Sequence, residues 1–184
     1  MKKIFAIAAM ALLTFSAAQA QMKIGHVNFV ELVQLAPEAD SARETLATLQ
    51  KDAESTYQDM IDEYQNKLSQ YQSKSASWTA AVKESKEKEL MQIQTNIQEF
   101  QQSITQELQA KQNELMAPLY DKAQEAVNKV AKAQGIAVVF DSGSALYFDD
   151  ALTVDLTKAA RKEIGIPDDR TLEGLAEQLS AQQQ

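Results

Sequence analysis

The chain has 184 residues, with 26 acidic and 18 basic side chains and a formal net charge of −8. This acidic balance argues against a general nucleic-acid binder, because phosphate contacts need clustered Lys and Arg. There is no cysteine and only one histidine, so disulfides are excluded. The residues needed for a catalytic triad with histidine or for most zinc sites are also missing or too few.

Residues 1–20 have the parts of a secretory signal. A positively charged start precedes the apolar run 4–15, and the small-x-small triplet Ala18-Gln19-Ala20 stands before Gln21. The apolar run is shorter than the roughly 20 residues that a membrane-crossing helix needs. We therefore expect export and cleavage between Ala20 and Gln21. Cleavage there removes two lysines and leaves 16 basic against 26 acidic residues, a net charge of −10.

The exported chain opens with a short predicted strand, residues 23–29, which is rich in β-branched and aromatic side chains. Asn28 and Glu31 have the spacing of a capping box, so a short helix should follow to about Leu35. The single histidine, His26, lies in this strand, where a structural role is expected because a metal site needs further ligands.

Two long helices follow, from Pro37 to about Lys74 and from Val82 to Gln134. Pro37 suits the first turn of a helix. Each helix has an apolar stripe at helical spacing, and the hydroxyl-rich stretch 73–81 between them suits a reversal of direction. The stripes are Leu46, Leu49, Ala53, Tyr57, Met60, Tyr64, Leu68, Tyr71, Ser75 and Trp78 in the first helix and Leu90, Ile93, Ile97, Phe100, Ile104, Leu108, Leu115 and Leu119 in the second. The pattern predicts an antiparallel hairpin that buries one stripe on the other.

The second helix is expected to be longer than the first: at 1.5 Å per residue its length is about 80 Å, against about 55 Å for the first. Its last part should therefore belong to a base, with Pro118 near the junction. A proline within a helix removes one hydrogen bond and clashes with the preceding turn, so a kink is predicted between Glu114 and Pro118.

After the hairpin, Gly135 is placed to cap the helix. The apolar run 136–140 is predicted to be a buried strand, 141–144 a turn, and 145–148 a second strand, so that the two strands form a β-hairpin. Asp155 is expected to cap a helix that ends before Gly165.

The C-terminal part of the chain begins with a linker, 166–169. Residues 171–184 are predicted to form one more weak helix on Leu172, Leu175 and Leu179, with a frayed end.

No motif indicates an active site. The paired carboxylates Asp149-Asp150 and Asp168-Asp169 stand in turn-like sequence, which favours capping over acid–base chemistry. There is no glycine-rich phosphate loop. We predict no enzyme activity, no catalytic residue, no metal site and no cofactor. Around the turn, residues 66–90 carry five lysines and three glutamates, for which ion pairs on a solvated surface are the expected explanation.

A few large apolar residues lie off the two stripes. Ordinary packing explains scattered residues of this kind, but adaptable methionine and aromatic side chains also suit weak contacts to an unfolded partner. The candidates for such contacts are Ile61, Trp78, Val82, Met91, Met116 and Tyr120.

The order of these parts resembles the Skp/OmpH family of periplasmic chaperones. The resemblance is carried by the strand 24–28, the long hairpin that begins at Pro37, the segment Ala126–Asp141 and the helix start Asp155-Leu156-Thr157. It covers roughly residues 23 to 165. The arm is generic amphipathic helix, whereas the last two segments are fairly specific.

The resemblance implies a homotrimer whose strands build a small β body and whose arms surround a cavity. That cavity would hold unfolded outer-membrane β-barrel proteins without ATP. The best-known family member is strongly basic, with positive arm tips assigned to contact with lipopolysaccharide or anionic membrane, and the acidic balance of this chain argues against such contact. Apolar side chains that would supply the inter-chain core are Val27, Phe29, Val138, Phe140, Leu146 and Phe148.

The expected fold is thus α+β and mostly α, with a long antiparallel helical hairpin arm on a small β-sheet body built by trimerisation. The predicted parts are the cleaved signal 1–20, the body 21–36 and 119–165, the arm 37–118 with its tip near 73–81, and a partly disordered extension 166–184. A structural or adaptor protein of the envelope that binds a folded partner is the alternative. A cytosolic prefoldin-like chaperone is a third, against which the signal argues.

Overall fold

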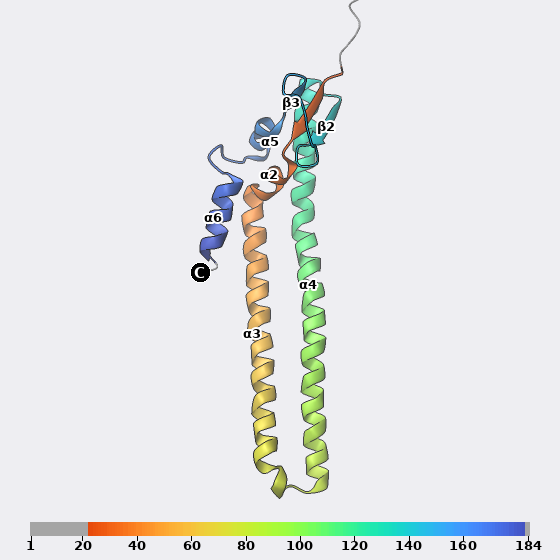
Figure 1. Cartoon of the computed structure of the whole chain (residues 1–184), viewed down its shortest axis with the longest axis vertical. Helices are drawn as coiled ribbons and strands as arrows, with labels where there is room; N and C mark the ends of the chain where they lie inside the picture. Colours follow the sequence, from red (N-terminus) through yellow and green to blue (C-terminus); the bar gives the residue numbers. More distant parts are fainter. Residues whose placement is uncertain (1–21, 183–184) are drawn as a thin grey trace, which may run out of the picture. The chain divides into compact units, whose positions relative to one another are not determined.

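The computed structural model describes residues 22–182, which are mostly helical with one small parallel sheet (Figure 1). The predicted signal and its cleavage site lie outside the described residues. The chain divides into two compact units. Residues 35–122 form the first, called here the hairpin unit. Residues before 35 and from 123 onward form the second, called here the strand unit.

The hairpin unit consists of α3 (Pro37–Lys74), the short 3-10 helix η1 (Ser75–Ser77) and the larger part of α4 (Ala80–Gln134). These bounds confirm the predicted long helices to within two residues at each end. Pro37 occupies the first turn of α3 together with two acidic residues, where the helix dipole favours negative charge. The tip is closed by backbone hydrogen bonds, including Trp78 N–H to Ser75 O at 3.2 Å.

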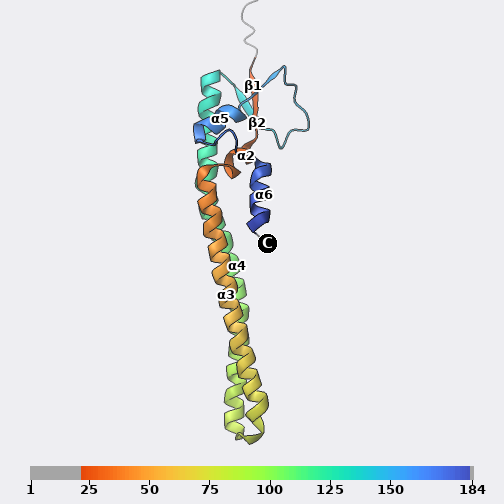
Figure 2. The same ribbon diagram turned by 90° about the vertical axis from the view of Figure 1, so that its left-hand side faces the viewer.

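The two helices lie side by side in both views (Figures 1 and 2). Every residue of the two predicted stripes is buried or half-buried, and Ile93, Ile97 and Leu119 are the most enclosed of them. Most of the other positions around them are exposed. The stripe prediction is therefore confirmed, and burial of apolar side chains along this seam is what holds the pair together.

Pro118 lies inside α4, which continues unbroken to Gln134. The helix is not interrupted at Pro118, and a bend there stays a prediction. A proline costs one backbone hydrogen bond, and helical turns resume on both sides of it. Near this position Lys122 pairs with Glu38 of α3, and its ammonium group lowers the pKa of that carboxyl below its usual value.

The strand unit contains a three-stranded sheet in the order β2-β1-β3, formed by β1 (Ile24–Val27), β2 (Val138–Asp141) and β3 (Thr153–Asp155). Both pairings are parallel, with His26 beside Phe140 on one side and beside Asp155 on the other.

The predicted β-hairpin is wrong. Residues 145–148 are irregular, and β3 pairs with β1 rather than with β2. Because all strands point the same way, the chain must return along the sheet between β2 and β3. Residues 142–152 make that return.

Short helices surround the sheet. α2 spans Phe29–Gln34, and Glu31 N–H donates to Asn28 Oδ1 at 3.0 Å, which is half of the predicted capping box. α5 spans Thr157–Ile164, with Thr157 N–H donating to Asp155 Oδ1 at 2.8 Å. Gly135 and Gly165 follow their helices with φ of 68° and 87°, which confirms the predicted cap at Gly135 and the predicted end of α5 before Gly165.

The C-terminal extension contains one helix, as the sequence predicted. α6 spans Leu172–Gln182 and begins with Gly174 N–H donating to Thr171 Oγ1 at 3.1 Å. Leu175 is buried. The helix predicted for this segment is therefore confirmed over residues 172–182, while residues 183–184 lie outside the described part of the chain.

Arg161 holds this extension to the rest of the strand unit. Its side chain is almost fully buried and pairs with Glu31 of α2. The same guanidinium donates to Pro167 O and to Arg170 O, both at 2.6 Å. Apolar packing around this network comes from Leu32, Val33, Leu156, Ala160, Ile164 and Ile166, all of which are buried.

Candidate interaction surfaces

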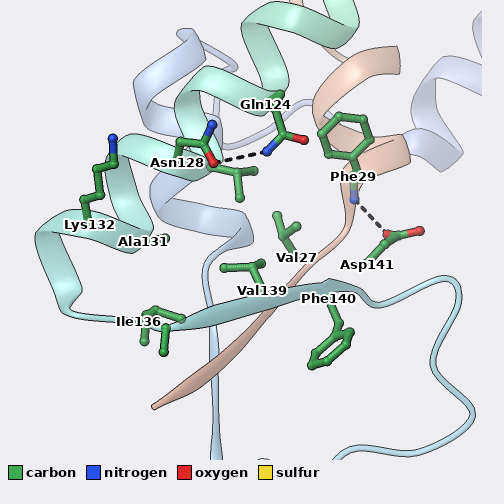
Figure 3. A pocket seen from close by; sticks show the side chains of 12 residues that line it. Val27, Phe29, Gln124, Asn128, Ala131, Lys132, Ile136, Val139, Phe140 and Asp141 are labelled. Atoms are coloured by element: carbon green, nitrogen blue, oxygen red, sulfur yellow. Dashed lines mark hydrogen bonds between the residues drawn. The ribbon is translucent and has the colours of Figure 1, made fainter. Parts of the chain in front are cut away.

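The sheet has two different faces, because successive side chains of a strand point to opposite sides. On one face Val27 and Val139 lie against the last turns of α4, near Ala131, around a hollow of about 410 Å³ (Figure 3). The Phe29 N–H closes the end of this hollow by donating to Asp141 Oδ1 at 3.2 Å. This face is largely covered by the chain itself.

The opposite face is covered over β1, where Phe148 of the return segment stacks on His26, and is open over β2. Phe140 points away from α4 (Figure 3) and is 55% exposed, and its neighbour two residues back, Val138, is 39% exposed. Leu146 and Tyr147, in the return segment, are more exposed still. The apolar run that the sequence predicted to be a buried strand is therefore covered on one side only within a single chain. We call Val138, Phe140, Leu146 and Tyr147 the open apolar surface.

The six candidates for an inter-chain core are thus divided. Val27 is buried within its own unit and Phe29 is half-buried at the start of α2. Phe148 is half-buried and stacks on His26, with ring centroids 4.0 Å apart and an interplanar angle of 27°. Only Val138, Phe140 and Leu146 belong to the open apolar surface.

His26 is enclosed at the edge of this surface. It is 8% exposed, and its Nδ1 atom has no hydrogen-bond partner among the described residues. The nearest carboxylate oxygen, Oδ1 of Asp155, lies 4.0 Å from it. The packing against Phe148 agrees with the structural role predicted for this residue.

The tip of the hairpin unit contains a network of charges. Lys67 of α3 and Lys86 of α4 both pair with Glu89, and their ammonium groups lower the pKa of Glu89 from 4.5 to about 2. The Tyr71 hydroxyl donates to Glu87, which raises the pKa of the phenol. With Lys88 paired to Glu84, three of the five lysines of residues 66–90 are in ion pairs, as the ion-pair explanation predicted.

The predicted client-contact residues are spread along the hairpin unit. Met91, Tyr120 and Val82 are exposed, by 57%, 50% and 40%. Ile61, Trp78 and Met116 are half-buried, and Trp78 packs edge-on against Tyr71 with centroids 5.9 Å apart. No hollow described for the unit is lined by any two of these six residues.

The sequence analysis missed a groove in the middle of the hairpin unit. It is an open groove of about 400 Å³ with five half-buried stripe residues as its floor, and its rims are formed by Gln50 and Glu54 of α3 and by Gln101 and Thr105 of α4. The floor residues are Ala53, Tyr57, Phe100, Ile104 and Leu108. The sequence analysis assigned these residues to helix pairing alone. One feature of the composition could have drawn attention to this part of α4: residues 91–106 contain a single charged side chain, Glu99.

The acidic side chains and the histidine of the described residues do not form a metal-binding cluster. Within residues 22–182 there is no group of three His, Cys, Asp or Glu side chains placed to hold a metal ion. Asp149 accepts the Ala151 N–H at 2.8 Å, so its carboxylate closes a turn, as predicted for this pair. Among the same residues, none of the helices is both long enough and apolar enough to span a bilayer.

Comparison with known protein families identifies the family of the chain. The sequence model of the family described as outer membrane protein (OmpH-like) matches residues 23–164. The chain belongs to the OmpH-like family. The match ends at the last residue of α5, so α6 of this OmpH-like protein lies beyond it.

Two relatives support the assignment. The chaperone protein Skp of Pectobacterium atrosepticum is 27% identical over 165 residues, which cover 88% of this chain and all of that protein. A crystal structure assigned to an OmpH-like outer membrane chaperone of Caulobacter crescentus aligns with a TM-score of 0.68 at 15% identity. It covers 84% of this OmpH-like chain and 91% of its own, and it supports the fold.

Proposed function

We propose that this OmpH-like protein is a chaperone of the periplasm that holds unfolded outer-membrane β-barrel proteins and prevents their aggregation without ATP. The observation that carries the proposal is the match to the Skp chaperone over the whole length of that protein. The hairpin unit agrees with it, because it offers a long surface of half-buried apolar and exposed polar side chains.

We further propose that the working form is a homotrimer joined through the open apolar surface. A monomer that keeps Phe140 and Leu146 in water forgoes their burial, which is worth about 1.5–3 kcal/mol for each large side chain. Parallel strands are also usually covered on both faces. A second and third copy of the chain would supply the missing cover.

Export to the periplasm is part of the same proposal and rests on the predicted signal in residues 1–20. Contact of the arm tips with membrane or lipopolysaccharide is not included. Three of the five lysines near the tip pair with Glu84 or Glu89, and the exported chain has a net charge of −10.

A light-scattering aggregation assay tests the chaperone proposal. A urea-unfolded outer-membrane β-barrel is diluted into buffer with and without the mature protein, in the absence of nucleotide. The proposal predicts that turbidity is suppressed. Turbidity equal to that of the barrel alone would overturn it and favour the adaptor alternative, in which the hairpin binds a folded envelope protein.

A variant locates the contact. Replacing Ile61, Trp78 and Met91 together by serine should raise the turbidity if these side chains touch the client, and far-ultraviolet circular dichroism should show the same helicity. Equal suppression by the variant and by the unchanged protein would remove these three residues from the client-binding surface.

A further inference from the structure

The return segment, residues 142–152, forms a loop beside the sheet (Figure 2), and only its two ends are fixed by hydrogen bonds. Turns at Asp141 and Asp149 close these ends, because the two carbonyls accept backbone N–H groups of the segment at 3.1 Å and 2.9 Å. Residues 145–148 between the turns make none of the hydrogen bonds present among the described residues. Side-chain packing alone therefore holds the middle of the segment on the sheet.

The middle of the segment contacts the sheet through Phe148. Its ring stacks on the imidazole of His26, with centroids 4.0 Å apart and an interplanar angle of 27°. An open hollow of about 340 Å³ lies beside the stacked rings. Besides these rings, its lining comes from the sheet and the segment: Ile24, Gly25, Phe140, Ala145, Tyr147 and Thr153. The segment thus packs around a hollow rather than onto a closed core, so the stack on His26 is the contact that fixes its position.

The imidazole beneath Phe148 is enclosed with one nitrogen unpartnered. His26 is 8% exposed, and its buried Nδ1 atom has no hydrogen-bond partner among the described residues. In a neutral ring one nitrogen carries no proton, so Nδ1 can lie here as an unprotonated atom. Protonation gives both nitrogens an N–H and the ring a positive charge. At this position the new donor lacks an acceptor and the charge is shielded from water, and both effects are costly.

Few groups around His26 can compensate for that charge. On β3, Oδ1 of Asp155 lies 4.0 Å from Nδ1, too far for a hydrogen bond, and it already accepts a backbone N–H of α5 at 2.8 Å. The side chain of Asp155 is 60% exposed, and pairing with a solvated carboxylate contributes little. The return segment brings Tyr147 and Asp149, and β2 ends at Asp141; both of these carboxylates accept N–H groups of their own turns. No other carboxylate of the described residues lies within 4.0 Å of the imidazole nitrogens.

We propose that His26 is a proton-sensitive latch for the return segment. The neutral ring holds Phe148 on the sheet, and the protonated ring releases it so that water reaches the imidazolium. The chain has a single histidine, and histidine ordinarily changes charge between about pH 5 and 8, so the segment is held at the upper end of this range and released at the lower end. Because the segment carries Leu146 and Tyr147, release also takes apart the open apolar surface and weakens assembly in acid. This last consequence rests on the proposed homotrimer, whereas the latch itself does not.

Contact between the two rings tests the latch directly. The protein is prepared with carbon-13-labelled histidine and phenylalanine, and nuclear Overhauser effects between the rings of His26 and Phe148 are measured at about pH 7.5 and about pH 5.5. The latch predicts that they are present at the higher pH and lost at the lower pH, where the carbon shifts of the imidazole show it to be protonated. Contacts that persist with a protonated ring would overturn the proposal, and so would a ring that stays neutral at the lower pH.

The dissociation constant of assembly, measured by light scattering over a dilution series at the same two pH values, tests the consequence. Acid should weaken assembly of the unaltered protein by about tenfold or more. His26→Phe keeps a ring that can stack but takes up no proton, so its assembly should change by less than about twofold, with helicity checked by circular dichroism. Asp155→Asn removes the nearest carboxylate and should enlarge the effect of acid.

Two results of this assay would overturn the latch. Equal weakening in His26→Phe would assign the effect of acid to the carboxylates of the chain. Loss of the effect in Asp155→Asn would assign it to an ion pair between Asp155 and His26. If the unaltered protein fails to assemble at either pH, the proposed homotrimer is refuted, and the contact between the two rings still decides the latch.

Discussion

Arg161 is expected to contribute more to the stability of the strand unit than any other charged side chain in it. The guanidinium and the carboxylate of its partner, Glu31, have side-chain exposures of only 11% and 19%. Two backbone carbonyls of the C-terminal extension depend on the same guanidinium. Replacing Arg161 by methionine keeps much of its volume but leaves a carboxylate and two carbonyls without their donor.

The expected loss of folding stability follows from the groups that R161M leaves without a donor. Removing one partner of a buried ion pair costs about 3–5 kcal/mol, because the remaining charge stays desolvated. Replacing Glu31 by leucine in the same chain removes the stranded charge, so the double variant should recover part of the loss. Replacing the whole pair by apolar side chains is often close to neutral.

A double-mutant cycle measures this coupling. Urea unfolding followed by circular dichroism is carried out on the unaltered protein, R161M, E31L and the double variant at one protein concentration. The structure predicts an interaction energy at the upper end of the range of about 0.5–3 kcal/mol seen for residues in contact. It also predicts faster hydrogen exchange across residues 166–182 in R161M. Additive losses, with exchange of the extension unchanged, would refute the assignment of Arg161 as its anchor.

Two further substitutions test local features. Glu89 has its pKa lowered to about 2 by Lys67 and Lys86, so it stabilises the tip above its ordinary value of 4.5 and loses that effect as the pH falls through about 2. Urea unfolding followed by the fluorescence of the single tryptophan should show E89Q to be less stable than the unaltered protein at neutral pH, with the difference vanishing towards pH 2; a constant difference would contradict it. A Cβ added at Gly25 would stand 3.2 Å from two side chains and a carbonyl oxygen, so Gly25→Ala should cost about 1–3 kcal/mol by overpacking. Gly143→Ala meets one side chain alone, the Asp141 carboxylate at 3.3 Å, and is expected to cost less than Gly25→Ala.

The helices were predictable because each signal is local. The stripes repeat over many turns, Pro37 fixes a start, and Gly135 and Gly165 stand where the backbone needs positive φ. The strands were harder. A short apolar run does not say which neighbour it pairs with, so residues 145–148 were taken as the partner of β2, when the pairing strand for both edges was β1.

The interaction surfaces were only partly predictable for a related reason. Phe140 and Leu146 were recognised as apolar residues in the right segment, but how much of each is exposed depends on parallel pairing that the sequence did not indicate. The groove between α3 and α4 was missed because Phe100 and Ile104 fit the buried stripe. Periodicity identifies the side of a helix that faces its partner, and it does not report how completely the partner covers each residue.

The central claim is that the chain assembles through its open apolar surface into a chaperone that takes up an unfolded barrel. Size-exclusion chromatography with light scattering on residues 21–184, alone and after dilution of a urea-unfolded β-barrel, tests it most directly. The account predicts the mass of three chains alone, and of three chains with one barrel in the mixture. It also predicts that Phe140→Asp lowers the mass towards one chain. A monomer or dimer of the unaltered protein, or a trimer that leaves the barrel to aggregate, would contradict it.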